Sequence, residues 1–290
     1  MMVADTPSST QGWAERGAAC DARGVDTMPV VAAAAGDSRT LLAPLAAPAV
    51  ARTLQRSVVG DFRSGARSYA IPCFRFAGPV ADHEPIRLGL FAGVHGDEPA
   101  GGAALVEFLV SLAADPERAR GYELFVYPIV NPTGCEDGTR HNRAGRDLNR
   151  EFWRESTQPE VRSLETELRA RRFHGLIALH ADDTCEGHYG YSHGCELDDA
   201  LLRPALLAAE RVLPRDRRAT IDGFTAREGV IADCFHGILS APPEQRPRPF
   251  NVIFETPAHA PFGLQVAANV AALDAIVATY RGYLSYAQNL

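Results

Sequence analysis

The stretch IRLGLFAGVHGDEP, residues 86–99, joins an apolar run to a histidine and a glutamate. The run that ends at Gly93 is almost entirely apolar, which predicts a buried strand. His95 and Glu98 follow it three residues apart, so they leave the end of that strand together. Ligands of open α/β sheets bind at the carboxyl ends of strands, and a His-Glu pair there can hold a metal ion. By itself the pair also fits a solvated histidine beside a helix-start carboxylate.

A second strand end supplies another histidine. Zinc in a catalytic site takes three protein ligands, commonly two His and one Glu, and keeps one position open. The sequence LIALH, residues 176–180, reads as a short buried strand that ends in His180, and the polar residues 182–184 after it read as a turn. The chain has nine histidines, but few of them end such a run. His180 is therefore the candidate third ligand beside His95 and Glu98.

A carboxylate ends one more strand-like run, FNVIFETP, residues 250–257. The run is rich in β-branched and aromatic residues, and Pro257 stops it because proline cannot donate to a ladder. Glu255 is thus a strand-end carboxylate. Facing a metal ion, it can take a proton from a water that the ion activates. The alternative is an edge-strand glutamate in water.

Guanidinium and amide groups are dense between these elements, in NPTG (131–134) and TRHNRAGRDLNREFW (139–153). Few aliphatic residues occur here, which predicts a polar cleft or surface. Arginine binds carboxylates through two parallel hydrogen bonds, and a neighbouring asparagine can add a donor. The stretch therefore predicts an anion site, with a solvated basic loop paired to Asp147 as the alternative.

In order and approximate spacing, these motifs resemble the zinc metallocarboxypeptidases, the carboxypeptidase A-like group, and particularly short bacterial members such as murein-peptide amidases. The resemblance covers roughly Pro72 to the C-terminus. It implies a mixed, mostly parallel central sheet with helices on both faces, an α/β fold. It rests on the motifs at His95–Glu98, Asn131–Gly134, Thr139–Arg140, Asp147–Arg150, His180 and Glu255.

The resemblance also implies a role for each motif. One Zn²⁺ ion is held by His95, Glu98 and His180, and Glu255 is the general base. Arg140 polarises the scissile carbonyl. The substrate carboxylate is gripped by Asn149 and Arg150. The implied activity is cleavage of an amide bond next to a free carboxylate, in a peptide substrate.

Three features leave alternatives open. Arg143 lies close enough to Arg140 that either could polarise the carbonyl, and Arg140 is favoured because it occupies the Thr-Arg position. Arg143 is also a candidate for substrate binding. The family's mobile tyrosine, which lies over the substrate, has no clear match before Glu255. Tyr189 and Tyr191 fit packing roles better than the role of that tyrosine. The same motifs occur in the succinylglutamate desuccinylase and aspartoacylase group, whose substrates are small N-acyl amino acids. A binding protein that holds carboxylates without catalysis is a third possibility.

The composition fits one enzyme domain. The chain has 290 residues, 46% hydrophobic, with a net charge of −7. The acidic balance argues against nucleic acid or an anionic membrane as the main partner, since both require basic surface. We find no apolar run of the ~18 to 20 residues that a membrane span needs. The oligomeric state is not apparent from the sequence.

The domain boundary is expected near residue 50. Residues 1–50 are rich in Ala, Ser, Thr, Gly and Pro, which predicts a weakly ordered leader with one short helix at 41–53, and residues 51–290 form the catalytic domain. Six scattered cysteines without a Cys-x-x-Cys pair favour reduced thiols and a cytoplasmic location. Cys185, near His180, is interpreted as a buried thiol rather than a ligand or nucleophile.

Hydrophobic periodicity gives the remaining elements. Alternation over 57–77 predicts antiparallel strands at one sheet edge. Helical spacing predicts helices at 99–114, 160–172, 197–213 and 262–284, with one more strand at 122–130. The proline-rich residues 240–249 predict an extended loop before the strand of Glu255.

Overall fold

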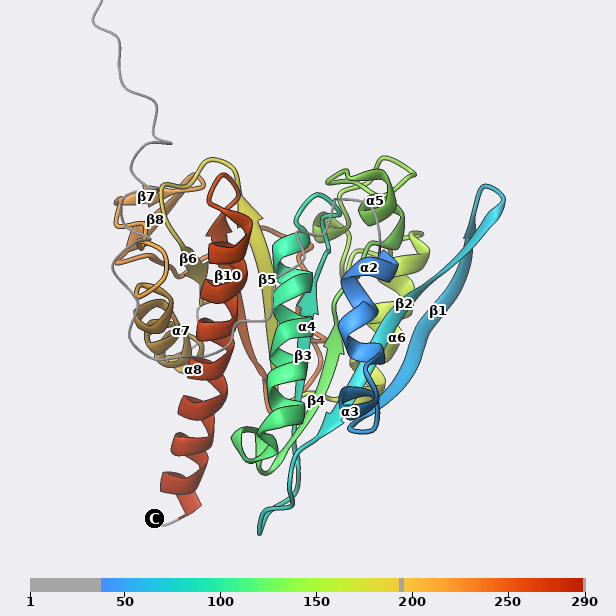
Figure 1. Ribbon diagram of the computed structural model, residues 1–290. Coiled ribbons are helices and arrows are strands. Elements are labelled where there is room, and N and C mark those ends of the chain that lie inside the picture. The colour runs from blue at the N-terminus through green and yellow to red at the C-terminus, as the bar shows by residue number, and fades with distance from the viewer. Residues whose placement is uncertain (1–37, 193–195, 289–290) are drawn as a thin grey trace, which may run out of the picture. The chain divides into compact units, whose positions relative to one another are not determined.

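The computed structural model describes residues 38–192 and 196–288 (Figure 1). Within these ranges ten strands form one sheet, in the order β1-β2-β4-β3-β5-β10-β6-β9-β8-β7. Their bounds are β1 Leu54–Ser64, β2 Arg67–Ala77, β3 Ile86–Ala92, β4 Tyr122–Tyr127, β5 Gly175–Asp182, β6 Tyr189–Tyr191, β7 Thr220–Ile221, β8 Phe224–Arg227, β9 Val230–Ile231 and β10 Phe250–Pro257.

The centre of the sheet is parallel and its flanks are not. Strands β4, β3, β5 and β10 run parallel to one another. The pairs β1/β2, β2/β4, β10/β6, β9/β8 and β8/β7 are antiparallel, and β6/β9 is parallel. Five of the nine described pairings are therefore antiparallel, so the expectation of a mostly parallel sheet holds only for its centre. Short flanking strands have little periodicity, and for that reason the sequence did not reveal them.

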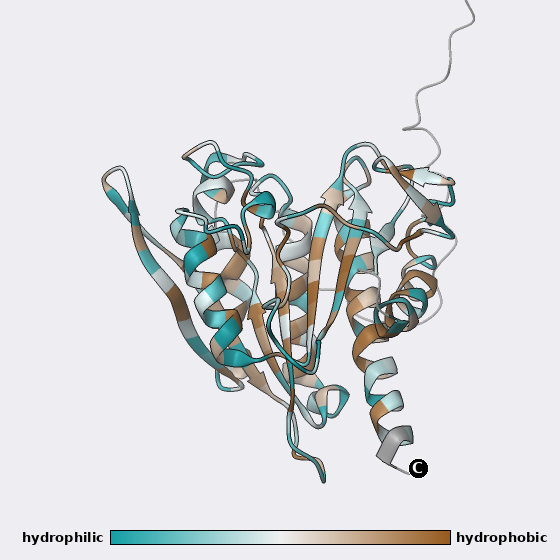
Figure 2. Cartoon of the chain, turned by 180° about the vertical axis from the view of Figure 1, so that it is seen from behind, coloured by the Kyte–Doolittle hydropathy of each residue, from teal (hydrophilic) through white to brown (hydrophobic). Residues whose placement is uncertain are grey.

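Helices cover both faces of the sheet, as predicted for this α/β fold. Helices α4, α7 and α8 pack on one face, where α4 contacts β3 and β5 and both α7 and α8 contact β10 (Figure 1). Helix α6 lies on the opposite face, which Figure 2 shows from behind. The helical bounds are α2 Ser38–Leu42, η1 Ala43–Ala46, α3 Pro48–Ala51, α4 Pro99–Ala114, η2 Pro116–Ala119, α5 Pro132–Asp137, η3 Leu148–Arg150, α6 Pro159–Arg171, α7 Glu196–Ala209 and α8 Phe262–Gln288.

The core lies between the central strands and the helices. Figure 2 shows hydrophobic residues concentrated along those strands and polar residues on the outer sides of the helices. On the face of α6, that helix packs Val161, Leu164 and Leu168 against the sheet. These packed layers hold the carboxyl ends of β3, β5 and β10 in fixed positions, because core side chains are close-packed.

Short helices lie before residue 50. Residues 38–51, part of the expected leader and overlapping its predicted short helix at 41–53, form α2, η1 and α3 and bury Leu41, Leu45 and Val50. These short helices contact α4, and this apolar contact orders a segment whose composition alone predicts disorder. The leader expected over residues 1–37 lies outside the described residues.

The sequence analysis found no apolar run long enough to span a membrane, but helix α8 contains one. Its residues Phe262–Tyr286 are long and apolar enough to cross a membrane by length and composition, with a mean hydropathy of 1.5 in the relevant window. In the structure 44% of that window is buried, and α8 packs against α4, α7 and β10. These contacts are those of a core helix.

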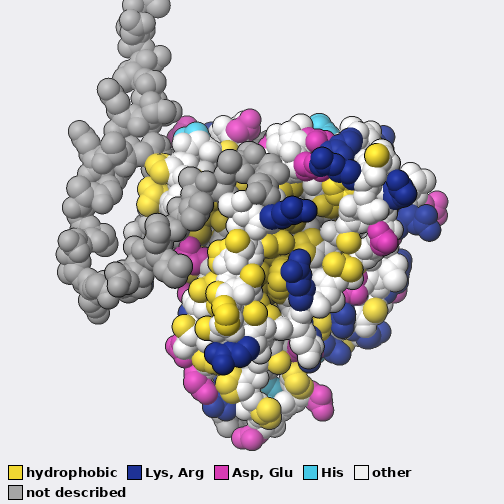
Figure 3. Space-filling model, turned by 45° about the vertical axis from the view of Figure 1, so that its right-hand side comes forward, with side chains coloured by type: hydrophobic (Ala, Val, Ile, Leu, Met, Phe, Trp, Pro, Cys, Tyr) yellow, Lys and Arg dark blue, Asp and Glu magenta, His cyan; other side chains and the backbone are white. Residues whose placement is uncertain are grey.

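All basic side chains of this protein are arginines, because the sequence contains no lysine. Figure 3 shows several of them standing among apolar side chains on one face. Guanidinium groups are planar and donate hydrogen bonds in a fixed fork, so each one is suited to a carboxylate or phosphate.

Candidate metal centre and active site

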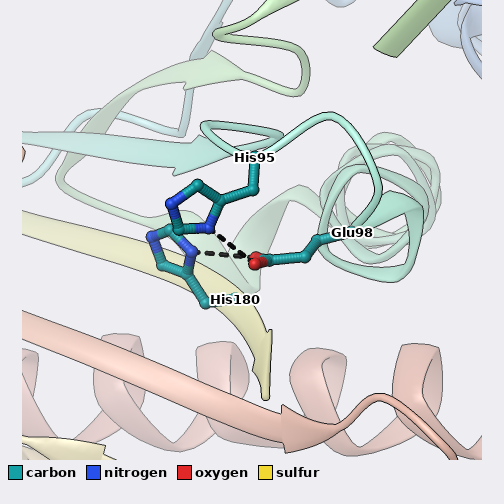
Figure 4. Close-up of side chains that lie close together, drawn as sticks. All are labelled: His95, Glu98 and His180. Carbon is teal, nitrogen blue, oxygen red and sulfur yellow. Dashed lines mark hydrogen bonds and ion pairs between the residues drawn. The ribbon is translucent and has the colours of Figure 1, made fainter. Parts of the chain in front are cut away.

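Three predicted ligands meet at the carboxyl ends of β3 and β5. His95 lies in the loop after β3, Glu98 directly precedes α4, and His180 lies in β5. Figure 4 shows the two imidazole rings turned toward the carboxylate. His95 Nδ1 is 2.6 Å from Glu98 Oε1, and His180 Nδ1 is 2.9 Å from Glu98 Oε2. Pro99 begins α4 with the fixed φ that suits a first helical position, so Glu98 is held at a rigid helix start.

The donor set fits a metal ion. One donor atom from each residue lies within 4.8 Å of the other two, and all three residues are buried. Two imidazole nitrogens and one carboxylate oxygen are ligands of catalytic metal sites, which leave one position open. His95 and Glu98 also line a pocket. The cluster is therefore a candidate metal site.

The charges of the three residues and their neighbours strongly influence one another's pKa. Burial lowers the pKa of His95, but Glu98 and Asp147 on either side outweigh it and raise that pKa to about 9. Burial alone raises the pKa of Glu98, but His180 and His95 outweigh it and lower that pKa to about 2. For His180, burial dominates and lowers the pKa. The carboxylate is thus ionised, as a metal ligand must be.

Glu255 lies beside His180. The two residues are register partners on the parallel strands β10 and β5, and Tyr189 on β6 is the partner of Glu255 on the other side. Strand β10 is therefore internal to the sheet, which excludes the edge-strand alternative. Burial, followed by the charges of Glu98 and Asp182, raises the pKa of Glu255 well above its ordinary value. A carboxylate with a raised pKa beside a metal site is suited to accept a proton.

One pocket of about 410 Å³ is lined by His95, Glu98 and Glu255. Arg140, Asn149 and Arg150, from another segment of the sequence, line the same pocket. The remaining lining residues are Asp97, Ala181, Asp182, Asp183, Thr184, Tyr189, Tyr191, Asp222, Cys234, Phe235, Ile238, Ile253 and Ala258.

Arg140 and Arg143 take different positions. Arg140 lies in the pocket, where Nη1 is 3.6 Å from Glu98 Oε1 and Nη2 donates to Asp147 Oδ2 at 3.1 Å. The guanidinium of Arg143 donates to Asp137, lies over the ring of Tyr69 and does not line the pocket. Arg143, the second candidate for substrate contact, therefore lies outside the pocket, because Asp137 and Tyr69 hold its side chain elsewhere.

The two arginines should differ in mutagenesis. On the carbonyl-polarising role that the resemblance implies for Arg140, Arg140→Gln is expected to lower kcat for amide hydrolysis about 10²- to 10³-fold. Arg143→Gln is expected to change kcat by less than about two-fold. Steady-state kinetics of both variants measures this difference, and equal losses would contradict the assignment.

Asn149 and Arg150 are placed by the loop that follows Asp147. Asn149 Oδ1 accepts a hydrogen bond from Leu239 N at 2.9 Å. Arg150 donates to the backbone oxygen of Asn149, and its guanidinium carbon lies 4.1 Å from the centre of the Phe235 ring. Stacking and hydrogen bonding together limit the rotamers of Arg150, so its guanidinium is preorganised toward the pocket.

The sequence analysis missed the role of Asp147. Its Oδ1 lies 3.2 Å from His95 Nε2 and also accepts from Asn149 N, while Oδ2 accepts from Arg140. Asp147 therefore fixes the ring of a metal ligand, a pocket arginine and the turn of Asn149. Carboxylates that orient ligating histidines tune metal sites in this way. Its position directly before Leu148-Asn149-Arg150 was the available signal, but the sequence analysis assigned Asp147 a partner only in the alternative of a solvated basic loop.

Close backbone contact joins the loop of His95 to the first turn of helix α5 at Gly134. A Cβ on Gly96 would lie 1.9 Å from the carbonyl carbon of Gly134, which no side chain permits. Gly96 N donates to Thr139 O, and Asn131 Oδ1 accepts from Gly134 N at the start of α5. Glycine at 96 therefore allows the segments that carry His95 and Arg140 to approach each other.

Tyr189 and Tyr191 are buried residues that line the pocket, and the buried Cys185 does not line it. The tyrosine hydroxyls donate to Asp182 and Asp222 at 3.0 and 2.6 Å. The thiol of Cys185 lies in the same hydrophobic cluster, and burial raises its pKa. These contacts agree with packing roles.

Comparison with known proteins agrees with the geometry. Residues 85–189 match the family model of the succinylglutamate desuccinylase/aspartoacylase catalytic domain. A candidate metallopeptidase from Shewanella amazonensis has 25% identity and a TM-score of 0.70, covering 83% of this chain and 92% of its own. One from Shewanella denitrificans has 28% identity and a TM-score of 0.69, covering 83% and 90%.

The chain is thus similar to metallopeptidases and, over residues 85–189, to the succinylglutamate desuccinylase/aspartoacylase catalytic domain. A metallo-carboxypeptidase from Pseudomonas aeruginosa, solved with (2-guanidinoethylmercapto)succinic acid, shares the fold at 18% identity and a TM-score of 0.63, covering 84% of this chain and 69% of its own. No curated protein sequence matches the chain.

Proposed function

We propose that this metallohydrolase uses one zinc ion to cleave an amide bond next to a free carboxylate in a peptide. The observation that carries the proposal is that one pocket contains His95, Glu98, Glu255, Arg140 and Arg150, with His180 beside them. A metal site alone is compatible with many reactions. The adjoining base and the guanidinium groups restrict it to hydrolysis of a substrate that carries an anion.

Each side chain has a task that follows from its position. His95, Glu98 and His180 would hold the zinc ion, which when bound polarises the scissile carbonyl and makes water more acidic. Glu255 accepts the proton of the attacking water and returns one to the leaving amine. Arg140 stabilises the negative charge that develops on the carbonyl oxygen. Asn149 and Arg150 hold the substrate carboxylate at a fixed distance from the attacked bond.

A ligand with the same kind of anion is known for one structural relative. The Pseudomonas aeruginosa metallo-carboxypeptidase was solved with a substituted succinic acid, which carries carboxylates. This supports the proposal that Arg150 in the present chain receives a carboxylate. The stacking of Arg150 on Phe235 leaves the edge of its guanidinium for a bidentate contact.

Hydrolysis of a small N-acyl amino acid is the second candidate. The match of residues 85–189 to the succinylglutamate desuccinylase/aspartoacylase model favours it. The same base and metal ligands would serve, and only the size of the substrate would differ. A pocket of about 410 Å³ accommodates an N-acyl amino acid as a whole.

One experiment separates these candidates. The zinc-loaded enzyme is assayed with blocked dipeptides, their C-terminal amides, N-acyl aspartate and N-succinyl glutamate. We expect cleavage of the dipeptides with a free carboxylate, no cleavage of the amides, and loss of activity with a chelator that zinc restores. Preference for the N-acyl amino acids would favour the second candidate. A protein without stoichiometric metal that binds these acids without cleaving them would be a carboxylate-binding protein.

Arg150→Gln tests the carboxylate contact directly. Loss of a charge-assisted hydrogen bond is expected to raise KM for the free acid about ten- to a hundred-fold. Metal content should stay unchanged, because Arg150 contacts no ligand residue in the described structure. An unchanged KM would rule out Arg150 as the carboxylate contact.

A further inference from the structure

A second cavity of about 270 Å³ lies along the proline-rich segment before β10. None of its lining residues lines the pocket of the metal site. Pro242, Pro243 and Pro249 form part of its walls, and their fixed φ angles make those walls rigid. The full lining is Ser240, Ala241, Pro242, Pro243, Arg246, Arg248, Pro249 and Asn251.

Asn251 gives this cavity an unsatisfied polar group. The residue is 4% exposed, and neither Nδ2 nor Oδ1 has a hydrogen-bond partner in the described part of the chain. Its backbone is satisfied, because Asn251 N donates to Asp198 Oδ1 at 2.9 Å. Nearly all buried polar side chains are hydrogen-bonded, so a buried amide with both atoms unpaired indicates a missing partner. That partner must both accept from Nδ2 and donate to Oδ1.

The charge of the cavity indicates what the partner is. Arg248 forms no hydrogen bond or ion pair with any described residue. Arg246 donates hydrogen bonds to described residues only from Nη1, to the carbonyl oxygens of Pro243 and Gln245. No carboxylate lines the cavity, and Glu244 on the same segment is paired with Arg169 at 3.0 Å. Two guanidinium groups thus face a cavity without a counterion, in a chain whose net charge is −7.

We propose that this cavity binds a small hydroxyl-bearing oxyanion, either hydrogen phosphate or a hydroxycarboxylate. Arg246 and Arg248 donate to the anionic oxygens, for which the guanidinium fork is suited. Asn251 Nδ2 donates to a further oxygen, and Asn251 Oδ1 accepts from the hydroxyl of the ligand. The proposal is independent of the reaction at the metal site, because the two cavities share no residue.

Two segments of the chain, β10 and residues 239–240, connect the proposed anion cavity with the pocket of the metal site. Asn251, Ile253 and Glu255 alternate along β10 and therefore point to the same side of the strand. Ser240, at the other end of the cavity, accepts a hydrogen bond from the Trp153 indole, and the preceding Leu239 donates to Asn149. The proposed site therefore adjoins the segment that positions Asn149.

Calorimetric titration tests the site on the full-length, metal-loaded protein. Inorganic phosphate and malate are each titrated at constant ionic strength set by sodium chloride, and the tighter of the two identifies the kind of ligand. We expect saturable binding that does not depend on Arg150, and an Arg248→Gln variant whose Kd for this binding is about ten- to a hundred-fold higher. Arg162→Gln makes the same charge change at an exposed position on helix α6, and this variant should bind the anions like the wild type. Arg150→Gln should also retain binding, because its arginine belongs to the other pocket.

Asn251→Leu provides a second readout. It replaces an unsatisfied amide with an apolar group of similar size, so the Tm without anion should equal or exceed that of the wild type. Phosphate or malate should raise the Tm of the wild type but not of this variant. The proposal is overturned if neither anion binds the wild type, if Arg248→Gln binds as tightly, or if Arg150→Gln abolishes binding. Should Asn251→Leu fail to fold, the Arg248 comparison still decides.

Discussion

Glu255→Gln is expected to reduce amide hydrolysis by about 10⁴-fold while leaving metal content unchanged. The substitution keeps the size of the side chain but removes its ability to accept a proton, which is the contribution of a general base. Metal binding should persist because the proposed ligands are His95, Glu98 and His180, and Glu255 only neighbours them as the register partner of His180. Single-turnover kinetics and elemental analysis of the same preparation measure both quantities.

The control for this variant is Glu84→Gln, the same chemical change at an exposed position before β3. It lies at the opposite end of that strand from the metal site, and its activity should equal that of the wild type. A fully active Glu255→Gln enzyme would refute the general-base role. A variant that loses its metal would instead show that Glu255 supports the metal site.

Glu98→Gln is expected to abolish both metal binding and activity. The carboxylate of Glu98 contacts His95 and His180 and also accepts from Ala181 N at 3.1 Å, so it is the centre of the cluster. A neutral amide is a far weaker ligand, and it leaves two imidazoles without their common anion. After dialysis, metal content should fall below about a tenth of the wild-type value. Elemental analysis measures that loss, and zinc titration followed by activity shows whether excess metal restores function.

Glu107→Gln is the matched control, since Glu107 lies on helix α4 and is exposed. It should retain full metal content. If Glu98→Gln kept stoichiometric metal with the wild-type affinity, the metal site would have to be located elsewhere.

The strands that carry the candidate site could be predicted from sequence because each is a run of apolar residues ending in a polar one. His95, His180 and Glu255 each follow such a run, and the structure brings them together at adjoining strand ends. The register that sets Glu255 opposite His180 is a property of pairing between distant segments. No local pattern contains it.

The arginines show where sequence reasoning stops. Arg140 and Arg143 lie three residues apart in a loop, and their residue types are identical. Asp147 draws one guanidinium into the pocket, while Asp137 and Tyr69 draw the other away from it. Only the folded positions of these partners distinguish the two side chains. The short strands β6 to β9 could not be predicted from the sequence, because two to four residues are too few to show alternation.

The contact between Gly96 and Gly134 has a consequence for redesign of this enzyme. A library that randomises the loop of His95 without fixing Gly96 would force the backbone of that loop away from helix α5, because any residue larger than glycine collides with Gly134. Replacing either segment alone with that of a relative could cause the same collision. The two segments therefore behave as one module, and a transplant to another scaffold would have to move both together.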